Sequence, residues 1–266
     1  MLAVALAIGQ SASTPLAASH ITNGQVDAHA ATQSVEREVA AATARGGARW
    51  VGYRIKVAAG RKSMDCLDRT HIALEGASEV SLLARFEGTA ITRLRTATPD
   101  CEIDAGGLPV TWLENVKADD SANWLASLVN AQNADVRDRL NRVTKPAIVA
   151  LGMTEGTTAS RALVNIARNH PSTAIRNDGL FWLSQRAGDR LAVGAIAEAI
   201  EKDPDTEVRK RAVFALSQLP KDEGIPRLID VAKNNRNPAV RQQAMFWLGQ
   251  SGDPRAIKFF EDVLLK

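Results

Sequence analysis

Apolar residues recur at a fixed spacing in the C-terminal half of the chain. Three segments begin with Val or Ile followed by Arg, and carry a small residue at offset four, Phe at six, Leu at eight and Gln at ten. They start at Ile175, Val208 and Val240, so the spacings are 33 and 32 residues. Such a period predicts a solenoid, in which each helical hairpin buries its apolar face against its neighbours.

A weaker copy precedes these three segments. Val143, Val149 and Leu151 occupy the matching positions and keep only the apolar character. We therefore expect a solenoid of about four units over 143–266, each with a first helix, a short turn and a second helix. Residues 119–142 predict two capping helices, the first capped by Ser121.

The periodicity changes to strict alternation between about 50 and 115. Trp50 to Val57 alternates apolar and basic side chains, which predicts a strand with one solvated face. Glu87-Gly88 predicts a hairpin turn between two further strands. The remaining expected strands are His71–Leu74, Val80–Phe86, Ile91–Leu94, and a second hairpin of Cys101–Asp104 with Val110–Leu113.

The N-terminal part adds a leader and a helix. Residues 1–18 hold a short apolar run followed by small residues, as in a secretory signal, although no basic residue precedes the run. The alternative is an ordinary N-terminal segment. Val26 to Ala44 predicts an Ala-rich helix ended by Gly46-Gly47. We expect a 19–118 domain made of this helix and a small antiparallel sheet, in a periplasmic or secreted protein, with a cytoplasmic location as the alternative.

The net charge of the chain says little about the kind of partner that it binds. The net charge is +3, and 18 of the 33 basic and 14 of the 30 acidic residues lie from 143 onward, which gives +4 there and −1 before it. Neither half carries the concentrated basic field that nucleic-acid binding requires. No segment is apolar enough to span a membrane. We expect no nucleic-acid partner and no membrane span.

The repeat resembles the HEAT family, in particular the short bacterial repeats found in phycobilisome lyases. The features that carry the resemblance are the Val/Ile-Arg start, the small residue and the Leu of each unit, and Asp253-Pro-Arg-Ala-Ile in the last turn. The resemblance covers 143–266, and residues 1–120 match no family that we can name. It implies an α-solenoid of HEAT-like hairpins. With the strands predicted from the alternating segments, we expect an α+β fold in which a small N-terminal antiparallel β domain precedes this α-solenoid.

The Phe of each repeat points away from the face that the other apolar positions define. At about 100° per residue, Phe181 falls almost opposite Ile175, whereas Trp182 and Leu183 fall on the buried side. Because this position recurs, we expect an apolar stripe across the solenoid, edged by glutamines. Either an external protein or the N-terminal domain covers it. The binding residues would be Val149, Phe181, Phe214, Phe246, Gln185, Gln218 and Gln250.

The repeats also carry charged columns. Arginines follow the first apolar residue of three units, and aspartates lie in or beside the turns. A structural ladder that links adjacent repeats is the favoured interpretation, and an anion-binding ladder is the alternative. The residues are Arg176, Arg209, Arg241, Asp189, Asp222 and Asp253.

Two cysteines, Cys66 and Cys101, fall in the β domain. In an exported protein they predict a disulfide. The alternatives are a metal site with His71 and Asp104, or two buried thiols in a cytosolic protein. No nucleophile elbow, phosphate loop or dinucleotide fingerprint occurs, so we expect a non-catalytic protein without a cofactor.

The function that we expect is a protein–protein interaction scaffold. The alternatives are an enzyme or tetrapyrrole-handling protein, by the lyase resemblance, and a structural self-assembly module. The last alternative comes from the apolar end Phe259–Lys266, where solenoids usually have a polar cap.

Overall fold

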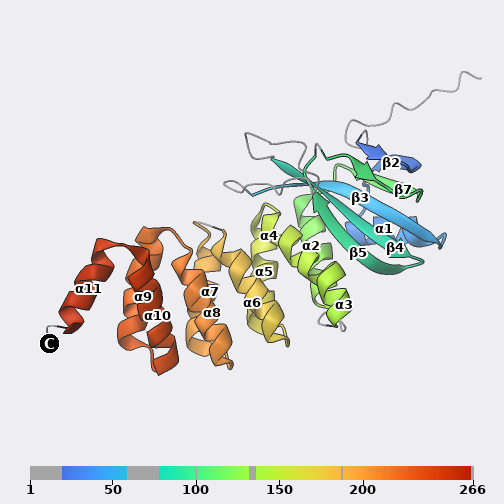
Figure 1. The fold of residues 1–266 in the computed structure, drawn as a ribbon. Helices are drawn as coiled ribbons and strands as arrows, with labels where there is room; N and C mark the ends of the chain where they lie inside the picture. Colours follow the sequence, from blue (N-terminus) through green and yellow to red (C-terminus); the bar gives the residue numbers. More distant parts are fainter. Residues whose placement is uncertain (1–19, 59–77, 100, 132–135, 187, 265–266) are drawn as a thin grey trace, which may run out of the picture.

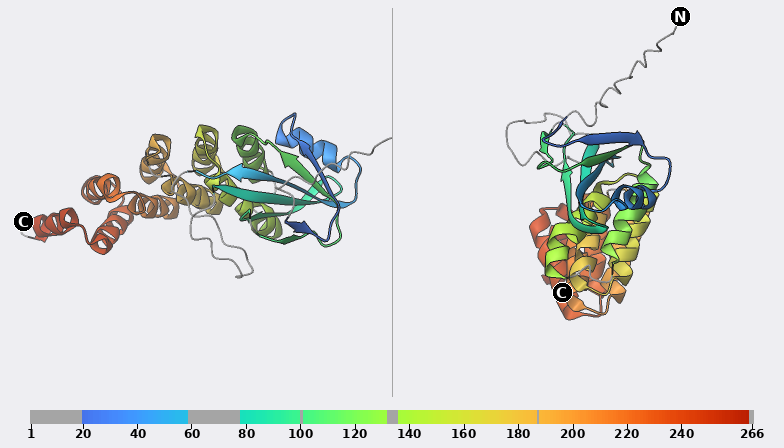
Figure 2. Two further views of the ribbon diagram at one scale, coloured as in Figure 1. Left: turned by 90° about the horizontal axis from the view of Figure 1, so that it is seen from above. Right: turned by 90° about the vertical axis from the view of Figure 1, so that its right-hand side faces the viewer.

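A computed structural model describes residues 20–58, 78–99, 101–131, 136–186 and 188–264. A sheet domain occupies the N-terminal end, and helical hairpins follow one another away from it to the C-terminus (Figures 1 and 2). The predicted signal segment 1–18 and the predicted strand His71–Leu74 lie outside the described residues.

The sheet has five strands in the order β2-β7-β3-β4-β5. β3, β4 and β5 form an antiparallel meander, whereas β7 runs parallel to both β2 and β3. The sheet is therefore mixed, and the prediction of an antiparallel sheet is wrong for the edge formed by β2 and β7. A short pair, β1 and β6, lies beside it. The strands are β1 (Ile21–Thr22), β2 (Val26–Ala30), β3 (Ala48–Lys56), β4 (Glu79–Glu87), β5 (Ala90–Ala97), β6 (Ile103–Asp104) and β7 (Val110–Glu114).

Two local predictions in this domain need correction. The expected helix over Val26–Ala44 is a strand, β2, followed by a shorter helix, α1 (Val35–Thr43). The expected hairpin of β6 and β7 does not form, because β6 pairs with β1 and β7 inserts between β2 and β3. Both errors have one cause: these segments pair with strands distant in sequence, which local periodicity does not report. The predicted β4–β5 hairpin at Gly88, whose φ is 60°, is confirmed.

Helix α2 (Ala118–Val129) joins the sheet to the solenoid. The Tyr53 hydroxyl of β3 lies 3.1 Å from the Ser121 hydroxyl, and the rings of Tyr53 and Trp124 meet edge to face with centroids 6.1 Å apart. Ser121 is therefore a buried contact inside α2 rather than its N-cap, which is Lys117. The end of β3 also bonds to the first repeat, since the Glu155 amide donates to the Lys56 carbonyl at 3.1 Å.

Eight helices form the four predicted units. They are α4 (Lys145–Met153), α5 (Thr157–Asn169), α6 (Thr173–Ser184), α7 (Arg190–Lys202), α8 (Thr206–Ser217), α9 (Lys221–Asn234), α10 (Pro238–Ser251) and α11 (Pro254–Leu264). A short helix, α3 (Arg137–Arg139), and a π-helical turn, η2 (Leu140–Thr144), run directly into α4. The expected second capping helix is therefore not separate, because it continues into the first helix of the repeats.

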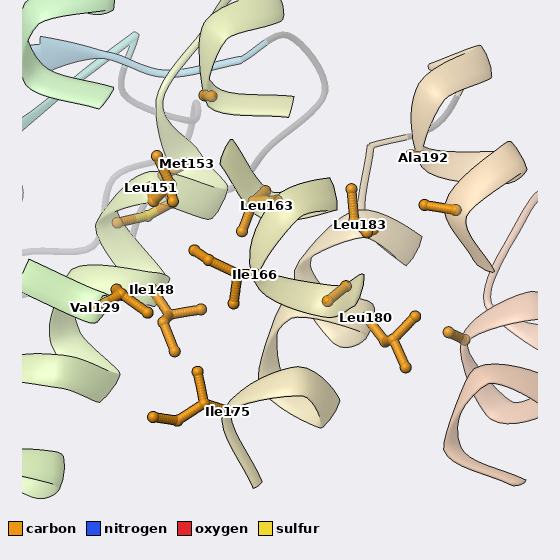
Figure 3. Close-up of a cluster of buried hydrophobic side chains, with 14 of the residues drawn as sticks. Val129, Ile148, Leu151, Met153, Leu163, Ile166, Ile175, Leu180, Leu183 and Ala192 are labelled. Atoms are coloured by element: carbon orange, nitrogen blue, oxygen red, sulfur yellow. The ribbon is translucent and has the colours of Figure 1, made fainter. Parts of the chain in front are cut away.

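The core runs without interruption from the sheet into the repeats. In Figure 3, Val129 of α2, Ile148 of α4 and Ile175 of α6 gather in one cluster, and Leu183 leads on toward Ala192 of α7. Each unit buries its apolar residues against the next, as a solenoid requires. The α+β fold with a C-terminal helical repeat array is confirmed.

Candidate functional site

The first helices of the four units, α4, α6, α8 and α10, pack in succession and carry the predicted stripe on one face. Phe246 is 53% exposed, and Val149, Phe181 and Phe214 are half-buried. None of the four enters the buried core. We call this row of four side chains the aromatic stripe.

Two tryptophans pack into the aromatic stripe from the neighbouring helical position. Trp247 lies between Phe214 of the preceding unit and Phe246 of its own, with both ring centroids 5.0 Å away. Trp182 meets Phe181 edge to face at 5.4 Å. Trp182 and Trp247 are half-buried and pack against the hydrophobic core, in agreement with the predicted buried side for Trp182.

A glycine of the first unit makes room for Trp182. A Cβ atom on Gly152 would lie 2.3 Å from the indole ring, closer than any real contact. The ring therefore rests directly on the backbone of α4. Aromatic contacts of this kind hold large side chains in fixed positions at the surface, which lowers the entropy lost on binding a partner.

Charged side chains lie along the same face. The Arg211 guanidinium stands 4.6 Å above the centre of the Phe214 ring, a cation–π distance. Burial raises the pKa of Asp178 on α6, and the positive charges of Lys145 on α4 and Arg211 on α8 oppose that rise. The carboxylate is therefore influenced by one positive charge from each of the two flanking units.

A cavity of 180 Å³ opens between the third and fourth units. Trp247 and Ile225 give it apolar walls, and Gln218, Lys221 and Gln250 give it polar groups. The indole Nε1 of Trp247 is buried and finds no acceptor among the described residues. A buried N–H without an acceptor is costly, so this indole is an unsatisfied donor in the wall between the two units.

The three predicted glutamines lie at the ends of the first helices, but they are not equivalent. Gln218 Nε2 donates to the Ser217 hydroxyl at 3.1 Å, and Gln185 Nε2 lies 3.4 Å from the Ser184 hydroxyl. Gln218 and Gln250 line the cavity, whereas Gln185 belongs to the preceding unit. The structure therefore brings two of the three to one place.

The arginine column makes contacts within the protein. Arg176 is buried and forms a two-bond ion pair with Asp203, with N–O distances of 2.9 and 3.0 Å. Arg209 also donates to the backbone carbonyl of Asp203, and Arg241 Nη1 donates to the Asn235 carbonyl at 2.9 Å. These arginines fasten the loops between units. Their acceptors, Asp203 and Asn235, are not among the aspartates predicted for the ladder.

The three predicted aspartates serve the turns instead. Asp189 caps α7 through the amide of Leu191 and accepts a hydrogen bond from the Ser160 hydroxyl of α5. Asp222 and Asp253 both pair with Arg255, at 3.2 and 2.8 Å. The hydrogen bond from the Arg255 guanidinium lowers the pKa of Asp253. Burial acts in the opposite direction but is weaker, so the pKa falls to about 2.

The cysteine prediction involves a residue that is not described. Cys101 is buried, with its Sγ 2.9 Å from the Thr98 hydroxyl, whereas Cys66 and His71 lie outside the described residues. Among the described residues no cysteine is free, and Cys101 is disulfide-bonded, as predicted; its expected partner Cys66 is outside the described ranges. Within the described ranges, no group of three His, Cys, Asp or Glu side chains gathers to hold a metal ion.

The apolar C-terminal helix is only partly covered. Phe259 is buried and Phe260 half-buried, whereas Ile257, Val263 and Leu264 are 56%, 50% and 83% exposed. Self-association through this helix stays a prediction. No helix in the described part of the chain is both long and apolar enough to cross a membrane.

Comparison with known proteins identifies the repeats. Residues 193–266 match the family model described as HEAT repeats, which confirms the resemblance seen in the sequence. HEAT repeats generally mediate protein–protein interaction. No curated protein matches the chain, and the N-terminal domain stays unidentified.

Among solved structures, the chain is similar to a crystal structure described as an engineered protein. The identity is 20%, over 55% of this chain and 62% of that one, with a TM-score of 0.21. The chain thus spans less than two thirds of that structure. A score this low supports no structural argument.

Proposed function

We propose that the protein is a non-catalytic interaction scaffold that binds an apolar segment of another protein along the aromatic stripe. The observation that carries this proposal is the exposure of Phe246 beside the cavity at Trp247. Large aromatic side chains held at a surface, next to an apolar hollow, are typical anchors of protein interfaces.

The size of the cavity favours a protein partner over a small molecule. Small-molecule sites usually measure roughly 300–1,000 Å³, whereas this cavity measures 180 Å³. One apolar side chain of a partner fits that scale better than a tetrapyrrole does.

A site-specific photocrosslinking experiment tests the proposal. A photoreactive phenylalanine analogue replaces Phe246 in one variant and Ile257 in a matched control, because the two side chains are 53% and 56% exposed but lie on α10 and α11. We expect a discrete crosslinked protein from position 246 in the native cells and none from position 257. Equal adducts from both positions, or none from either, would contradict the proposal.

Quantitative binding follows once the crosslinked segment is known. A synthetic peptide of that segment should bind about tenfold more weakly to Phe246→Ser, since losing a central aromatic anchor costs about 1–2 kcal/mol or more. Ile257→Ser should bind as the unchanged protein does. Trp247→Phe replaces the indole with a smaller phenyl ring, so a loss of binding there reports the combined contribution of the indole to the site. Unchanged binding by Phe246→Ser would reject the stripe as the site.

We also propose export, with Cys66 and Cys101 joined in the mature protein. Support comes from the apolar run and small residues of 1–18 and from the even cysteine count. Intact-mass measurement of protein from its native cells tests both points. A retained N-terminus, or two thiols that react with an alkylating agent before reduction, would refute them.

A further inference from the structure

Four arginines share the face of the sheet that points away from α1 and α2. Side chains alternate along a strand, so the face opposite the buried Val51, Tyr53 and Ile55 carries Arg54 of β3. Strand pairing places Arg85 of β4 on the same face, opposite Trp50 of β3. Arg93 and Arg95 of β5 complete the set.

The pairing within this set is unfavourable for the protein alone. Arg85 lies directly opposite Arg93 across the β4–β5 ladder, and like charges in that position destabilise a sheet. Arg95 lies opposite the apolar Leu83, which offers it no charge. A sheet that served only to cover a core would not need three arginines in two adjacent rows.

Carboxylates neutralise only half of the set. Arg54 Nη1 lies 3.7 Å from Glu79, and Arg85 Nη2 lies 3.1 Å from Glu87. Within the part of the chain that the structure describes, Arg93 and Arg95 form no ion pair or side-chain hydrogen bond. Donors and positive charge therefore remain available on β5.

We propose that this face binds an acidic protein segment in an extended conformation, running along β5. Arg93 and Arg95 are two residues apart and so about 6.8 Å apart along the strand. Carboxylates at every second position of an extended segment have the same spacing. Each would form a charge-assisted pair with one guanidinium, and the planar fork of arginine suits a carboxylate.

The flanking charges favour a peptide over a nucleic acid. Glu79 and Glu87 lie at opposite ends of β4 and would repel a continuous phosphate backbone that crossed the patch. Nucleic-acid binding also depends on many phosphate contacts, whereas two open arginines provide few. A short segment with separate carboxylates avoids both problems.

Fluorescence anisotropy with a labelled twelve-residue peptide of alternating Glu and Ser tests the proposal. We expect saturable binding that weakens with salt, and no binding of the matching Gln-Ser peptide. Arg93→Gln/Arg95→Gln should weaken binding about tenfold. The control Arg161→Gln/Arg190→Gln removes two exposed arginines from the second helices and should change it less than about twofold.

Several results would overturn the proposal. They are absence of peptide binding, equal losses in both double variants, tighter binding of a labelled oligothymidylate, or a dimer that only Arg93→Gln/Arg95→Gln dissociates. If that variant fails to fold, Arg93→Lys/Arg95→Lys keeps the charge but loses the fork, and should bind more weakly than the unchanged protein. Phe246→Ser should leave this binding unchanged, so the test is independent of the aromatic stripe.

Discussion

The buried ion pair between Arg176 and Asp203 offers the sharpest test of how the repeats are held together. The guanidinium donates from Nε and Nη2 to the two carboxylate oxygens at 2.9 and 3.0 Å. Its Nη1 donates to the carbonyls of His170 and Pro171 at 3.0 and 3.1 Å. The side chains are 8% and 4% exposed, so water cannot replace the carboxylate if it is removed.

Asp203→Ala should therefore destabilise the solenoid by about 3–5 kcal/mol, the usual cost of leaving one buried charge unpaired. Part of this loss comes from the Asp205 amide, which donates to Asp203 at 2.9 Å and contributes about 1 kcal/mol. A whole domain is stable by only about 5–15 kcal/mol, so the effect is large. Adding Arg176→Met should recover at least half of the loss, because no unpaired charge then stays buried.

Urea unfolding followed by far-ultraviolet circular dichroism measures these differences, and hydrogen exchange on α6 and α8 shows whether the loss is local. The control is Asp205→Ala, which removes a cap whose side chain accepts only from the Glu207 amide at 2.8 Å. The control should cost about 1 kcal/mol. If Asp203→Ala costs no more than the control, the ion pair does not fasten α6 to the loop between the second and third units.

Two further predictions concern the sheet domain. Tyr53→Phe should cost about 1 kcal/mol in urea unfolding, because the buried Ser121 hydroxyl loses its partner; a stability unchanged within error would contradict the contact between sheet and α2. Burial acts to raise the pKa of Glu38. Hydrogen bonds from the amides of Thr32 and Gln33, and the imidazole of His29 at 3.6 Å, outweigh burial and leave the pKa below its ordinary value of 4.5. A lowered folded-state pKa means that Glu38 stabilises the fold above about pH 4.5 and that this contribution is lost as the pH falls through the folded pKa. Thermal midpoints between pH 6 and pH 3 should therefore fall more for the unchanged protein than for Glu38→Gln, and parallel curves would refute the linkage.

The solenoid could be predicted from the sequence because its contacts are local. Each unit of 32 or 33 residues packs against the next, so the position of Ile175, Val208 and Val240 fixes both the helices and their buried faces. The sheet could not be predicted equally well. Val26 on β2 pairs with Val110 on β7, and no signal near either residue reports that partner.

The candidate site was predictable only in outline. The period predicts the row that ends at Phe246, and the helical angle places Trp182 on the buried side. The residue against which Trp182 packs, Gly152, lies on the neighbouring helix and could not be predicted from a single repeat. The cavity beside Trp247 needs two units in contact, so a single repeat cannot reveal it. The arginine face is not visible in the net charge of either half of the chain, because acidic residues elsewhere in the N-terminal half offset its positive charge.

Both proposed surfaces consist of residues that suit their own element poorly. Phe246 exposes an aromatic ring on a helix, and Arg93 places a positive charge opposite Arg85 in a sheet. Residues kept against local preference are expected where a partner compensates the cost. The sign of the stability change then separates the two explanations. Replacing a residue that only supports the fold lowers the stability of the protein. Arg93→Gln should instead leave the free protein equally or more stable while weakening its binding of the acidic segment. A clear loss of stability in that variant would mean that the arginine serves the sheet itself.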